Sequence, residues 1–493
     1  MAIQKGSSGP DVRQLQEQLS RLGFYAGKLD ADFGGQTDLA VKDFQRRLGL
    51  MPDGKIGPKT NQAISSALGG NVPGGTSFFK KFKQIQDDIF AGHTADGEHF
   101  AFLDRGIDAT SLGDLKALPK RQTPESPFKK EIPHYPDALT IKPDGNSLVC
   151  LAEPASTFQP YPSLGHIPFF TTDNIQGKGL DFLSDDIEQA CLCIAGYDLD
   201  GQTLKASWHG RDALSNVQFW SATKYLQAIH VVCQANKRNP TIRISDCRIR
   251  DQSTNQSPND EKFDDLVVDM VSYRNQANPA NGVERSNRIA LMLKHLCNPG
   301  EPDVQQWTSH LTGNNSLQFL GGYGFNSLID TPELYANVGP LVKTRDPGSS
   351  VNRVSAYDLV RVITMLGWHN SLPSTARLPD AQWHSLSSVI KGLGTDTARY
   401  VDVALHELGL EQQILSPVIL SKLGFGTLDQ GTDALTYVAL VQFIDPRPSP
   451  RHLRSLAFAL RIPTSAALAP THDAKMASEV TELLRRVVAN ELP

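Results

Sequence analysis

Apolar residues near the start of the chain recur three or four positions apart, which is the spacing of one helix face. The first such stripe consists of Val12, Leu15, Leu19 and Leu22. Gly23 follows it directly and is expected to end the helix. A second helix is predicted through Leu39, Ala40, Val41, Phe44 and Leu48. A short third helix follows Pro58. This pattern predicts a compact three-helix module over residues 1–68.

Two loops of this module, residues 30–37 and 53–60, have similar sequences. In each, a threonine (Thr37 or Thr60) occupies the position expected for a helix N-cap. Glycine pairs or Gly-Pro just before the threonine allow a tight turn. We therefore expect the two loops to be alike in structure.

Three segments of the module carry a resemblance to a known family. They are Gly6-Ser-Ser-Gly-Pro-Asp-Val-Arg-Gln-Leu-Gln16, Phe33-Gly34-x-x-Thr37-x-x-Ala40-Val41-x-x-Phe44-Gln45, and Asp53-Gly54-x-Ile56-Gly57-Pro58-x-Thr60. Together they resemble the type 1 peptidoglycan-binding domain over nearly the whole module. The resemblance implies a three-helix fold and peptidoglycan as a partner. The alternative is a module that binds another glycan or serves as a plain adaptor.

The next part of the chain has little periodicity. Residues 69–77 are rich in glycine and predict a flexible linker. A helix is expected from Phe78 to about Phe102, and prolines are frequent from about 119 to 180. We interpret residues 78–183 as a helix followed by irregular segments that wrap on the next domain.

A regular pattern begins at about residue 184 and extends through 493. Residues 185–190 suggest the end of a helix, and residues 192–197 form an apolar strand. Asp200-Gly201 is a strong hairpin signal, and residues 202–208 form the returning strand. After a loop over 211–219 comes a helix whose expected core face is Leu226, Ile229, Val232 and Cys233.

That helix begins with Ser221 and Lys224, which share one face because they are three positions apart. An unprotonated lysine can take the proton of a nearby serine and make it a nucleophile. The pattern Ser-x-x-Lys occurs at Ser77/Lys80, Ser126/Lys129, Ser221/Lys224 and Ser388/Lys391. Only the third pair follows two strands and a loop. The alternative is that Ser221 caps its helix and Lys224 lies on a solvated face.

The order strand, Asp-Gly turn, strand, loop and Ser-x-x-Lys helix resembles the serine β-lactamase and penicillin-binding-protein superfamily, closest in layout to class A β-lactamases. The resemblance implies that Ser221 forms an acyl-enzyme and that Lys224 is its base. The family has a second motif, Ser-x-Asn or Tyr-x-Asn, at a helix start. The candidates are Tyr273-Arg274-Asn275 and Ser286-Asn287. We prefer Ser286 and Asn287 because a long apolar helix follows them directly.

The family's third motif, Lys-Thr/Ser-Gly, is matched by Lys422-Leu423-Gly424 on a predicted strand over 419–427. Strands at 435–444 and about 455–462 and an amphipathic helix through 480–488 follow, as in the family. By resemblance, Lys422 lowers the pKa of Lys224, and the backbone N–H groups of Ser221 and Phe425 form the oxyanion hole. Leu423 replaces the hydroxyl that helps the family hold a substrate carboxylate.

Class A enzymes also use a glutamate in an omega loop, in Glu-x-x-Leu-Asn. The nearest stretch is Asp330-Thr331-Pro332-Glu333-Leu334-Tyr335, followed by a helix expected from about Val354. Aligned on Pro-Glu-Leu, the water-activating glutamate becomes Thr331. Fast hydrolysis of a β-lactam acyl-enzyme is therefore not expected, although Asp330 and Glu333 lie nearby.

Composition excludes several other functions. A length of 493 residues predicts two to four domains, and a net charge of −5 argues against a nucleic-acid binder. No apolar run has transmembrane length, and the first residues lack the features of a secretory signal. The six cysteines are expected to be buried thiols. His406-Glu407 lacks the second histidine of a zinc motif, and Ser207-Trp208-His209 lacks a His-x-His partner, so no metal or cofactor is expected.

The sequence thus predicts a multidomain protein with an all-α peptidoglycan-binding module. An α+β β-lactamase-like domain, with an antiparallel sheet flanked by helices, follows. The predicted function is that of a cell-wall-targeted serine hydrolase or acyltransferase, acting on a peptidoglycan stem peptide or a related amide or ester. One alternative is a non-catalytic wall-binding protein. A third hypothesis is that the protein is a component of a phage or injection apparatus. Without a signal peptide, the protein is expected to be made in the cytoplasm and to reach the periplasm or cell wall by a non-classical route.

Overall fold

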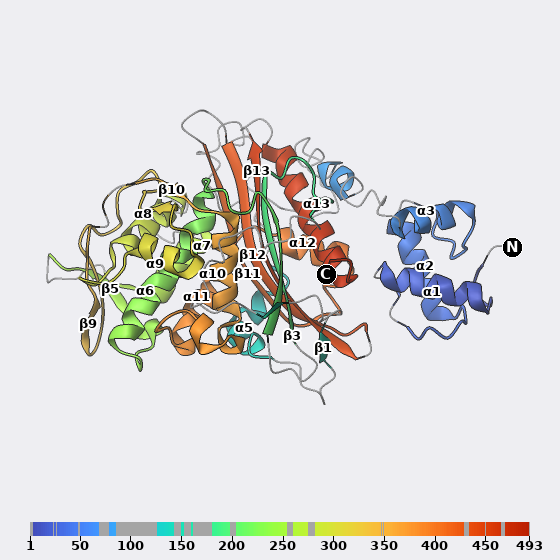
Figure 1. The fold of residues 1–493 in the computed structure, drawn as a ribbon, viewed down its shortest axis with the longest axis horizontal. Helices are drawn as coiled ribbons and strands as arrows, with labels where there is room; N and C mark the ends of the chain where they lie inside the picture. The colour runs from blue at the N-terminus through green and yellow to red at the C-terminus, as the bar shows by residue number, and fades with distance from the viewer. Residues whose placement is uncertain are drawn as a thin grey trace.

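The structure is a computed structural model of the chain (Figure 1). It describes residues 3–22, 24–25, 27–47, 50–68, 78–84, 126–141, 149–151, 159–160, 180–197, 204–253, 260–274, 282–346, 348, 350–427, 433–448, 450–464 and 469–492. The expected linker, most of the helix predicted from Phe78, the Asp200-Gly201 turn, Asn275 and Ser77 lie outside these residues. Residues 78–84 are helical, as predicted. Among the described residues, no helix is both long and apolar enough to cross a membrane.

The N-terminal module has three helices: α1 (Pro10–Arg21), α2 (Gly35–Arg47) and α3 (Pro58–Leu68). The predicted stripe of α1 is buried in a core of its own. Leu39 differs from the other apolar residues of α2, because it is 59% exposed. The helices α2 and α3 begin two residues before the threonines expected as N-caps, so that expectation is wrong.

The two threonines instead bind buried glutamines that organise the repeated loops. The Gln16 Nε2 atom donates to Thr37 Oγ1 (3.2 Å) and Asp30 Oδ1 (2.8 Å), and its Oε1 accepts from the Ala31 N–H (3.0 Å). The second loop repeats this arrangement around Gln45, whose partners are Thr60 Oγ1, Asp53 Oδ1, Lys55 O and the Gly54 N–H. The predicted likeness of the loops is therefore present in their hydrogen bonds.

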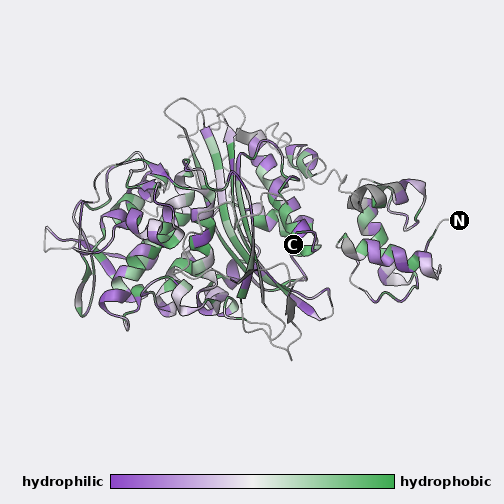
Figure 2. Ribbon diagram, in the orientation of Figure 1, coloured by the Kyte–Doolittle hydropathy of each residue, from purple (hydrophilic) through white to green (hydrophobic). Residues whose placement is uncertain are grey.

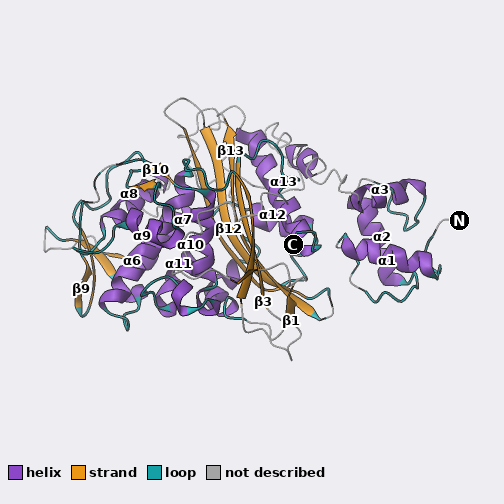
Figure 3. Cartoon of the chain, viewed as in Figure 1, coloured by secondary structure: helices purple, strands orange, loops and turns teal. Residues whose placement is uncertain are grey.

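The larger domain is built on a seven-stranded sheet in the order β11-β12-β13-β3-β4-β2, with β1 beside β13 (Figure 3). Its strands are β1 (Val149–Leu151), β2 (Gln159–Pro160), β3 (Gln189–Tyr197), β4 (Leu204–Arg211), β11 (Leu415–Thr427), β12 (Asp433–Asp445) and β13 (Arg451–Thr464). All pairs are antiparallel except β1 with β13. The helix end expected at 185–190 is absent, because residues 181–188 form turns and bends and β3 begins at Gln189.

Helices cover both faces of this sheet (Figure 1). On one side lie α6 (Lys224–Arg238), α7 (Phe263–Ser272), α8 (Gly282–His295), α9 (Val304–Thr312), α10 (Ala356–Gly367) and α11 (Trp383–Leu393). On the other lie α12 (Tyr400–Glu407) and α13 (Ala469–Val488). Hydrophobic residues gather on the sheet and on the helices beside it (Figure 2). The sheet lies between two apolar cores, one on each of its faces. The predicted fold class is confirmed.

Smaller elements complete the domain. Residues 126–141 contain a 3-10 helix, η4 (Lys129–His134), and α5 (Tyr135–Ala138), and Gln442 Nε2 donates to the Ala138 carbonyl (2.9 Å). A four-stranded sheet lies outside the helices, with β5 (Arg248–Asp251), β6 (Glu261–Lys262), β8 (Pro332–Ala336) and β9 (Gly339–Val342). A two-stranded sheet pairs β7 (Gln318–Phe319) with β10 (Asn352–Arg353).

Candidate active site

Ser221 lies in a 3-10 turn, η7 (Trp220–Thr223), that leads directly into α6. The turn is held against β12, because Thr436 Oγ1 donates to the Phe219 carbonyl (2.8 Å). Trp220 adopts a left-handed conformation with φ of 50°, which bends the chain just before Ser221. The N-cap of α6 is Thr223, not Ser221. The structure therefore does not support a capping role for Ser221.

Lys224 is fully buried and is not a solvated surface residue. Its Nζ donates to Ser286 Oγ (2.8 Å) and to Asn287 Oδ1 (2.6 Å). Ser286 gives its own hydrogen to the Met270 carbonyl (2.6 Å), so it can only accept from the lysine. The two residues preferred from the sequence thus lie directly against the Lys224 amine.

Burial, with the nearby charge of Lys422, holds the pKa of Lys224 well below its ordinary value. The amine is therefore uncharged over a range where an exposed lysine is protonated. An uncharged amine has two N–H groups and one lone pair. The Ser286 and Asn287 oxygens engage both N–H groups, which leaves the lone pair to accept a hydrogen.

Lys422 projects from β11 and is also fully buried. Its Nζ lies 3.5 Å from Asp396 Oδ1 and donates to the Leu423 carbonyl (3.1 Å). The Asp396 carboxylate favours the charged form of this lysine. Among the described residues, the acceptors of the Lys224 amine are uncharged, whereas the Lys422 amine faces a carboxylate.

Tyr273 connects Lys422 with Ser221. It is the C-cap of α7, with φ of 53°, and its hydroxyl donates to the Leu423 carbonyl (3.2 Å). The Lys422 Nζ lies 3.9 Å from the centre of its ring, and the Lys224 Nζ lies 5.3 Å from it. Burial raises the pKa of Tyr273, and hydrogen bonds from Lys422 and Ser221 oppose that rise. The hydroxyl therefore stays protonated at neutral pH.

The sequence favours Ser286 and Asn287 over Tyr273, whereas the structure places all three residues beside the lysines. The signal for Tyr273 was its Tyr-x-Asn pattern. Gly282, at the start of α8, lies against this tyrosine. A Cβ there would be 1.9 Å from the Tyr273 carbonyl oxygen. The absence of a side chain at Gly282 thus lets α8 and Tyr273 meet.

The third motif brings β11 close to the serine turn. A Cβ on Gly424 would lie 2.5 Å from the Phe219 carbonyl oxygen and 2.7 Å from the Ala222 nitrogen, so only glycine fits there. Leu423 is buried in the core on the opposite face of the sheet and offers no hydroxyl. Phe425 packs against that same core, and its backbone follows Gly424 along the strand.

The expected omega-loop glutamate is not at this site. Residues 332–336 form strand β8, and Glu333 pairs with Arg250 (2.8 Å) in the four-stranded sheet. Thr331 Oγ1 hydrogen-bonds Asp251 in the same region. The alignment on Pro-Glu-Leu is therefore wrong as a guide to an omega loop, whereas the helix expected after it is present as α10, which begins at Ala356.

The other candidate sites have structural partners. Ser126 Oγ donates to Asp402 (2.7 Å), and Ser388 is buried on α11 beside Asp264, whose pKa it helps to lower. His406 pairs with Glu411 (2.8 Å), while Ser207 hydrogen-bonds His209 (3.0 Å). Within the described ranges, no group of three or more potential ligands is arranged to hold a metal. Five cysteines in these ranges are buried free thiols: Cys191, Cys193, Cys233, Cys247 and Cys297.

Comparison with known proteins identifies the N-terminal module. Residues 8–64 match the family model described as a putative peptidoglycan binding domain. The chain is 48% identical over 65 residues to a spore cortex-lytic enzyme of Bacillus cereus, which covers 13% of this chain and 25% of the relative. It is 44% identical over 68 residues to an N-acetylmuramoyl-L-alanine amidase of Mycobacterium tuberculosis, covering 13% and 17%. The chain thus spans about a quarter or less of these curated relatives.

Solved structures similar to the chain include the TLA-1 extended spectrum β-lactamase. It has a TM-score of 0.36 and 15% identity, and the match covers 63% of this chain and 97% of that structure. The C-terminal domain of the Bacillus licheniformis BlaR penicillin receptor gives a TM-score of 0.30 and 10% identity, covering 61% and 89%.

Proposed function

We propose that the protein is a peptidoglycan-targeted serine enzyme that forms an acyl-enzyme at Ser221. One observation carries the proposal. The amine of Lys224 is buried one helical turn from Ser221, has only uncharged hydrogen-bond acceptors and has a lowered pKa. Burial of this kind disfavours the charged amine and so lets it act as a base.

In the proposed reaction, the Lys224 lone pair takes the hydroxyl hydrogen as Ser221 Oγ attacks a carbonyl carbon. The oxyanion that forms is stabilised by backbone N–H groups of Ser221 and Phe425. Loss of one such donor costs roughly 3–4 kcal/mol in other enzymes. The Tyr273 hydroxyl then passes its hydrogen to the leaving nitrogen or oxygen, and Lys224 returns the hydrogen to Tyr273. The products are an ester of Ser221 and the free leaving group.

The second half of the reaction transfers the acyl group to water or to an amine. Lys224 accepts the hydrogen of the attacking group and passes it to Ser221 Oγ as the ester bond between that oxygen and the acyl carbon breaks. Glu333 is engaged by Arg250, so it is not expected to activate water. The acyl-enzyme is therefore expected to be long-lived, or to react faster with an amine than with water.

The proposed substrate is a peptidoglycan stem peptide or a related amide or ester. The N-terminal module supports this choice, because it matches a peptidoglycan-binding family over residues 8–64. A module bound to the wall would raise the local concentration of wall peptides at the second domain. Leu423 supplies no hydroxyl for a substrate carboxylate, which favours substrates held by other groups.

A second candidate function is that of a wall-binding protein without turnover. Two observations favour it. Leu423 is buried and has no hydroxyl to hold a substrate carboxylate, and Glu333 forms an ion pair with Arg250 instead of activating water. The two functions differ in whether Ser221 reacts.

Labelling with a fluorescent penicillin and with an activated ester distinguishes these functions. The proposed enzyme becomes covalently labelled by at least one reagent, and the Ser221→Ala variant does not. Equal labelling of both proteins, or no labelling of a folded wild-type protein by either reagent, would overturn the enzymatic proposal.

A further inference from the structure

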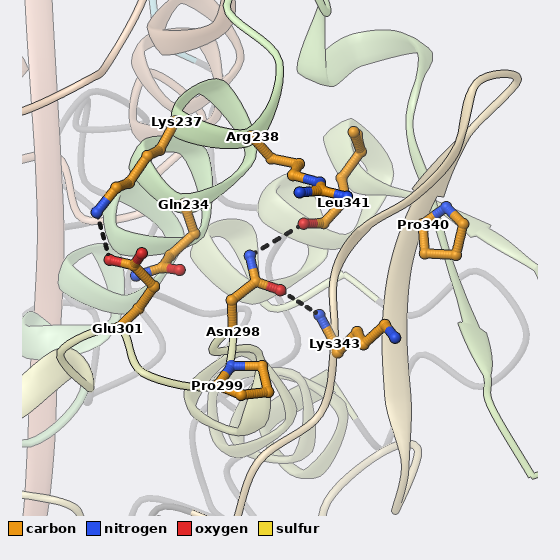
Figure 4. A pocket seen from close by; sticks show the side chains of 9 residues that line it. All are labelled: Gln234, Lys237, Arg238, Asn298, Pro299, Glu301, Pro340, Leu341 and Lys343. Atoms are coloured by element: carbon orange, nitrogen blue, oxygen red, sulfur yellow. Dashed lines mark hydrogen bonds and ion pairs between the residues drawn. The ribbon is translucent and has the colours of Figure 1, made fainter.

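A cavity of about 440 Å³ is lined by residues at the C-terminal end of α6 (Figure 4). Ser221 lies at the other end of this helix, just before its first residue. Gln234 and Arg238 line it from the last turns of α6. Asn298 and Glu301 come from the turn after α8, and Lys343 follows β9. Ten residues of α6 separate Lys224 from Gln234, which corresponds to about 15 Å of helix. The cavity is therefore separate from the candidate active site.

Gln234 is the buried polar group of this cavity. Its side chain is only 5% exposed, and its Oε1 has no hydrogen-bond partner among the residues that the structure describes. Its Nε2 lies 3.4 Å from His230 Nε2, which in turn lies 3.0 Å from the Pro302 carbonyl. A carbonyl can only accept, so the His230 Nε2 must carry a hydrogen. Two donors then face each other between Gln234 and His230.

Rotating the Gln234 amide by 180° removes this conflict, since its oxygen then accepts from His230. Burial lowers the pKa of His230 to about 4, so at neutral pH the ring is uncharged and has this single N–H. After this rotation the Gln234 amino group occupies the former position of the oxygen, and it is the amino group that lacks a hydrogen-bond partner. A buried donor left unsatisfied costs about 1–3 kcal/mol, which a ligand with an acceptor oxygen would recover.

The cavity also has an excess of positive charge. Lys237, Arg238 and Lys343 line the cavity with one carboxylate, that of Glu301, which pairs with Lys237 (2.6 Å), and Asp380 also acts on the Lys237 charge. Arg238 and Lys343 have no ion pair within the described part of the chain. In Figure 4, both lie across the cavity from the Lys237–Glu301 pair. The negative end of the α6 dipole explains a cation at position 238, but not one at 343 on another segment.

The walls that hold these donors are fixed. Asn298 Nδ2 donates to the Leu341 carbonyl (3.0 Å), and Asn298 Oδ1 accepts from the Lys343 N–H (3.2 Å), as the dashed lines in Figure 4 show. Pro299 and Pro340 add rigid apolar surface. The site therefore does not need to order its backbone when a ligand binds.

We propose that this cavity binds an anionic group with several acceptor oxygens, a carboxylate or a phosphate, through Gln234, Arg238 and Lys343. The rigid amide and the two cations supply donors from three directions. The proposal does not depend on any reaction at Ser221. A site of this kind would hold the carboxyl end of a wall peptide or a phosphate-bearing wall component.

The test is a calorimetric or NMR titration of full-length Ser221→Ala protein, in which chemistry at Ser221 cannot interfere. The probes are inorganic phosphate, N-acetyl-D-alanyl-D-alanine and the uncharged amide of that dipeptide. We expect at least one anion to bind and the amide to bind at least about tenfold more weakly. The better anion identifies the source of the ligand.

Variants then locate the site. In the Ser221→Ala background, Arg238→Gln and Lys343→Gln are each expected to weaken anion binding by about tenfold or more. Lys262→Gln removes the same charge from an exposed position on β6 and is expected to change binding less than twofold. Equal binding of the amide, no anion binding at 10 mM probe concentration, or equal effects of all three variants would overturn the proposal.

Discussion

Replacing Lys224 by methionine isolates the buried amine, because the two side chains have similar length and volume. The amine is fully buried and donates to Ser286 Oγ (2.8 Å) and Asn287 Oδ1 (2.6 Å). Methionine fills the same space without leaving a cavity. The substitution therefore removes the proposed base and two hydrogen bonds, and little else.

The effect on stability is expected to be small. Loss of the amine leaves the buried Ser286 Oγ and Asn287 Oδ1 atoms without this donor, at a cost of about 1–3 kcal/mol for each group. Against this loss, the lowered pKa of Lys224 means that the unfolded chain binds a proton more readily than the folded chain does. That proton favours unfolding at every pH below about 10.4, and its effect disappears above it. We expect the free energy of unfolding at pH 7 to change by less than about 2 kcal/mol in either direction.

The effect on acylation is expected to be large. Positioned bases contribute about 10²–10⁴-fold to rate, so the variant should acylate slower by about 3–5 kcal/mol in activation free energy. Because only the uncharged amine can accept a hydrogen, the wild-type rate should rise with pH through the pKa of Lys224. That rise should be complete well below the ordinary lysine value.

Stopped-flow acylation with an activated ester measures this rate, and thermal unfolding measures stability. Lys294→Met is the matched control. Lys294 is also fully buried, donates to the Gly321 carbonyl (2.9 Å) and Asn352 (2.6 Å), and has a lowered pKa for the same reason of burial. Equal loss of acylation in both variants, or a wild-type rate in Lys224→Met, would refute the role of Lys224 as base.

Three further predictions follow from the same geometry. Lys422→Gln removes a charge that lowers the pKa of Lys224, so that pKa rises and the acylation profile moves to higher pH; an unchanged profile contradicts this coupling. Gly424→Ala places a methyl carbon 2.5 Å from the Phe219 carbonyl oxygen, beside η7, and should slow acylation at least about tenfold. Gly322→Ala, whose methyl carbon would lie 3.8 Å from its nearest neighbour, should leave the acylation rate unchanged. Tyr273→Phe keeps the ring but removes the hydroxyl, and should slow acylation about 10²-fold with a change in melting temperature under about 4 °C; a normal rate excludes proton transfer by this residue.

Periodicity and turn residues were sufficient to predict much of the fold. The helix stripes of the N-terminal module, the strands around residues 192–197 and 435–444, and the final helix all appear in the structure. Predictions made from local sequence were less reliable where a distant side chain forms the hydrogen bond instead. Thr37 resembles an N-cap in sequence, but Gln16, 21 positions away, binds it instead. Such long-range hydrogen bonds leave no pattern in a single sequence.

In the candidate site, too, the features set by neighbouring residues were predictable and those set by distant residues were not. Ser221 and Lys224 are predictable because they are close in sequence, and the structure adds that the lysine is buried beside Ser286 and Asn287. The Tyr-x-Asn pattern marks Tyr273 as a candidate, but its position beside the lysines depends on a left-handed helix cap and on the hydrogen bond from its hydroxyl to the Leu423 carbonyl. Pro-Glu-Leu at 332–334 was misleading, because three matching residues do not fix the local structure, and here they lie in strand β8.

The ionisation of Lys224 at neutral pH tests the central claim most directly. Carbon-13 labelling of the lysine side chains, with Lys224→Met to assign the signal, allows its pKa to be measured by NMR in the intact protein. We predict an Nζ that is uncharged at pH 7, with a pKa that rises when Lys422 is replaced by glutamine. A protonated amine at pH 7, titrating near the ordinary lysine value, would contradict the account.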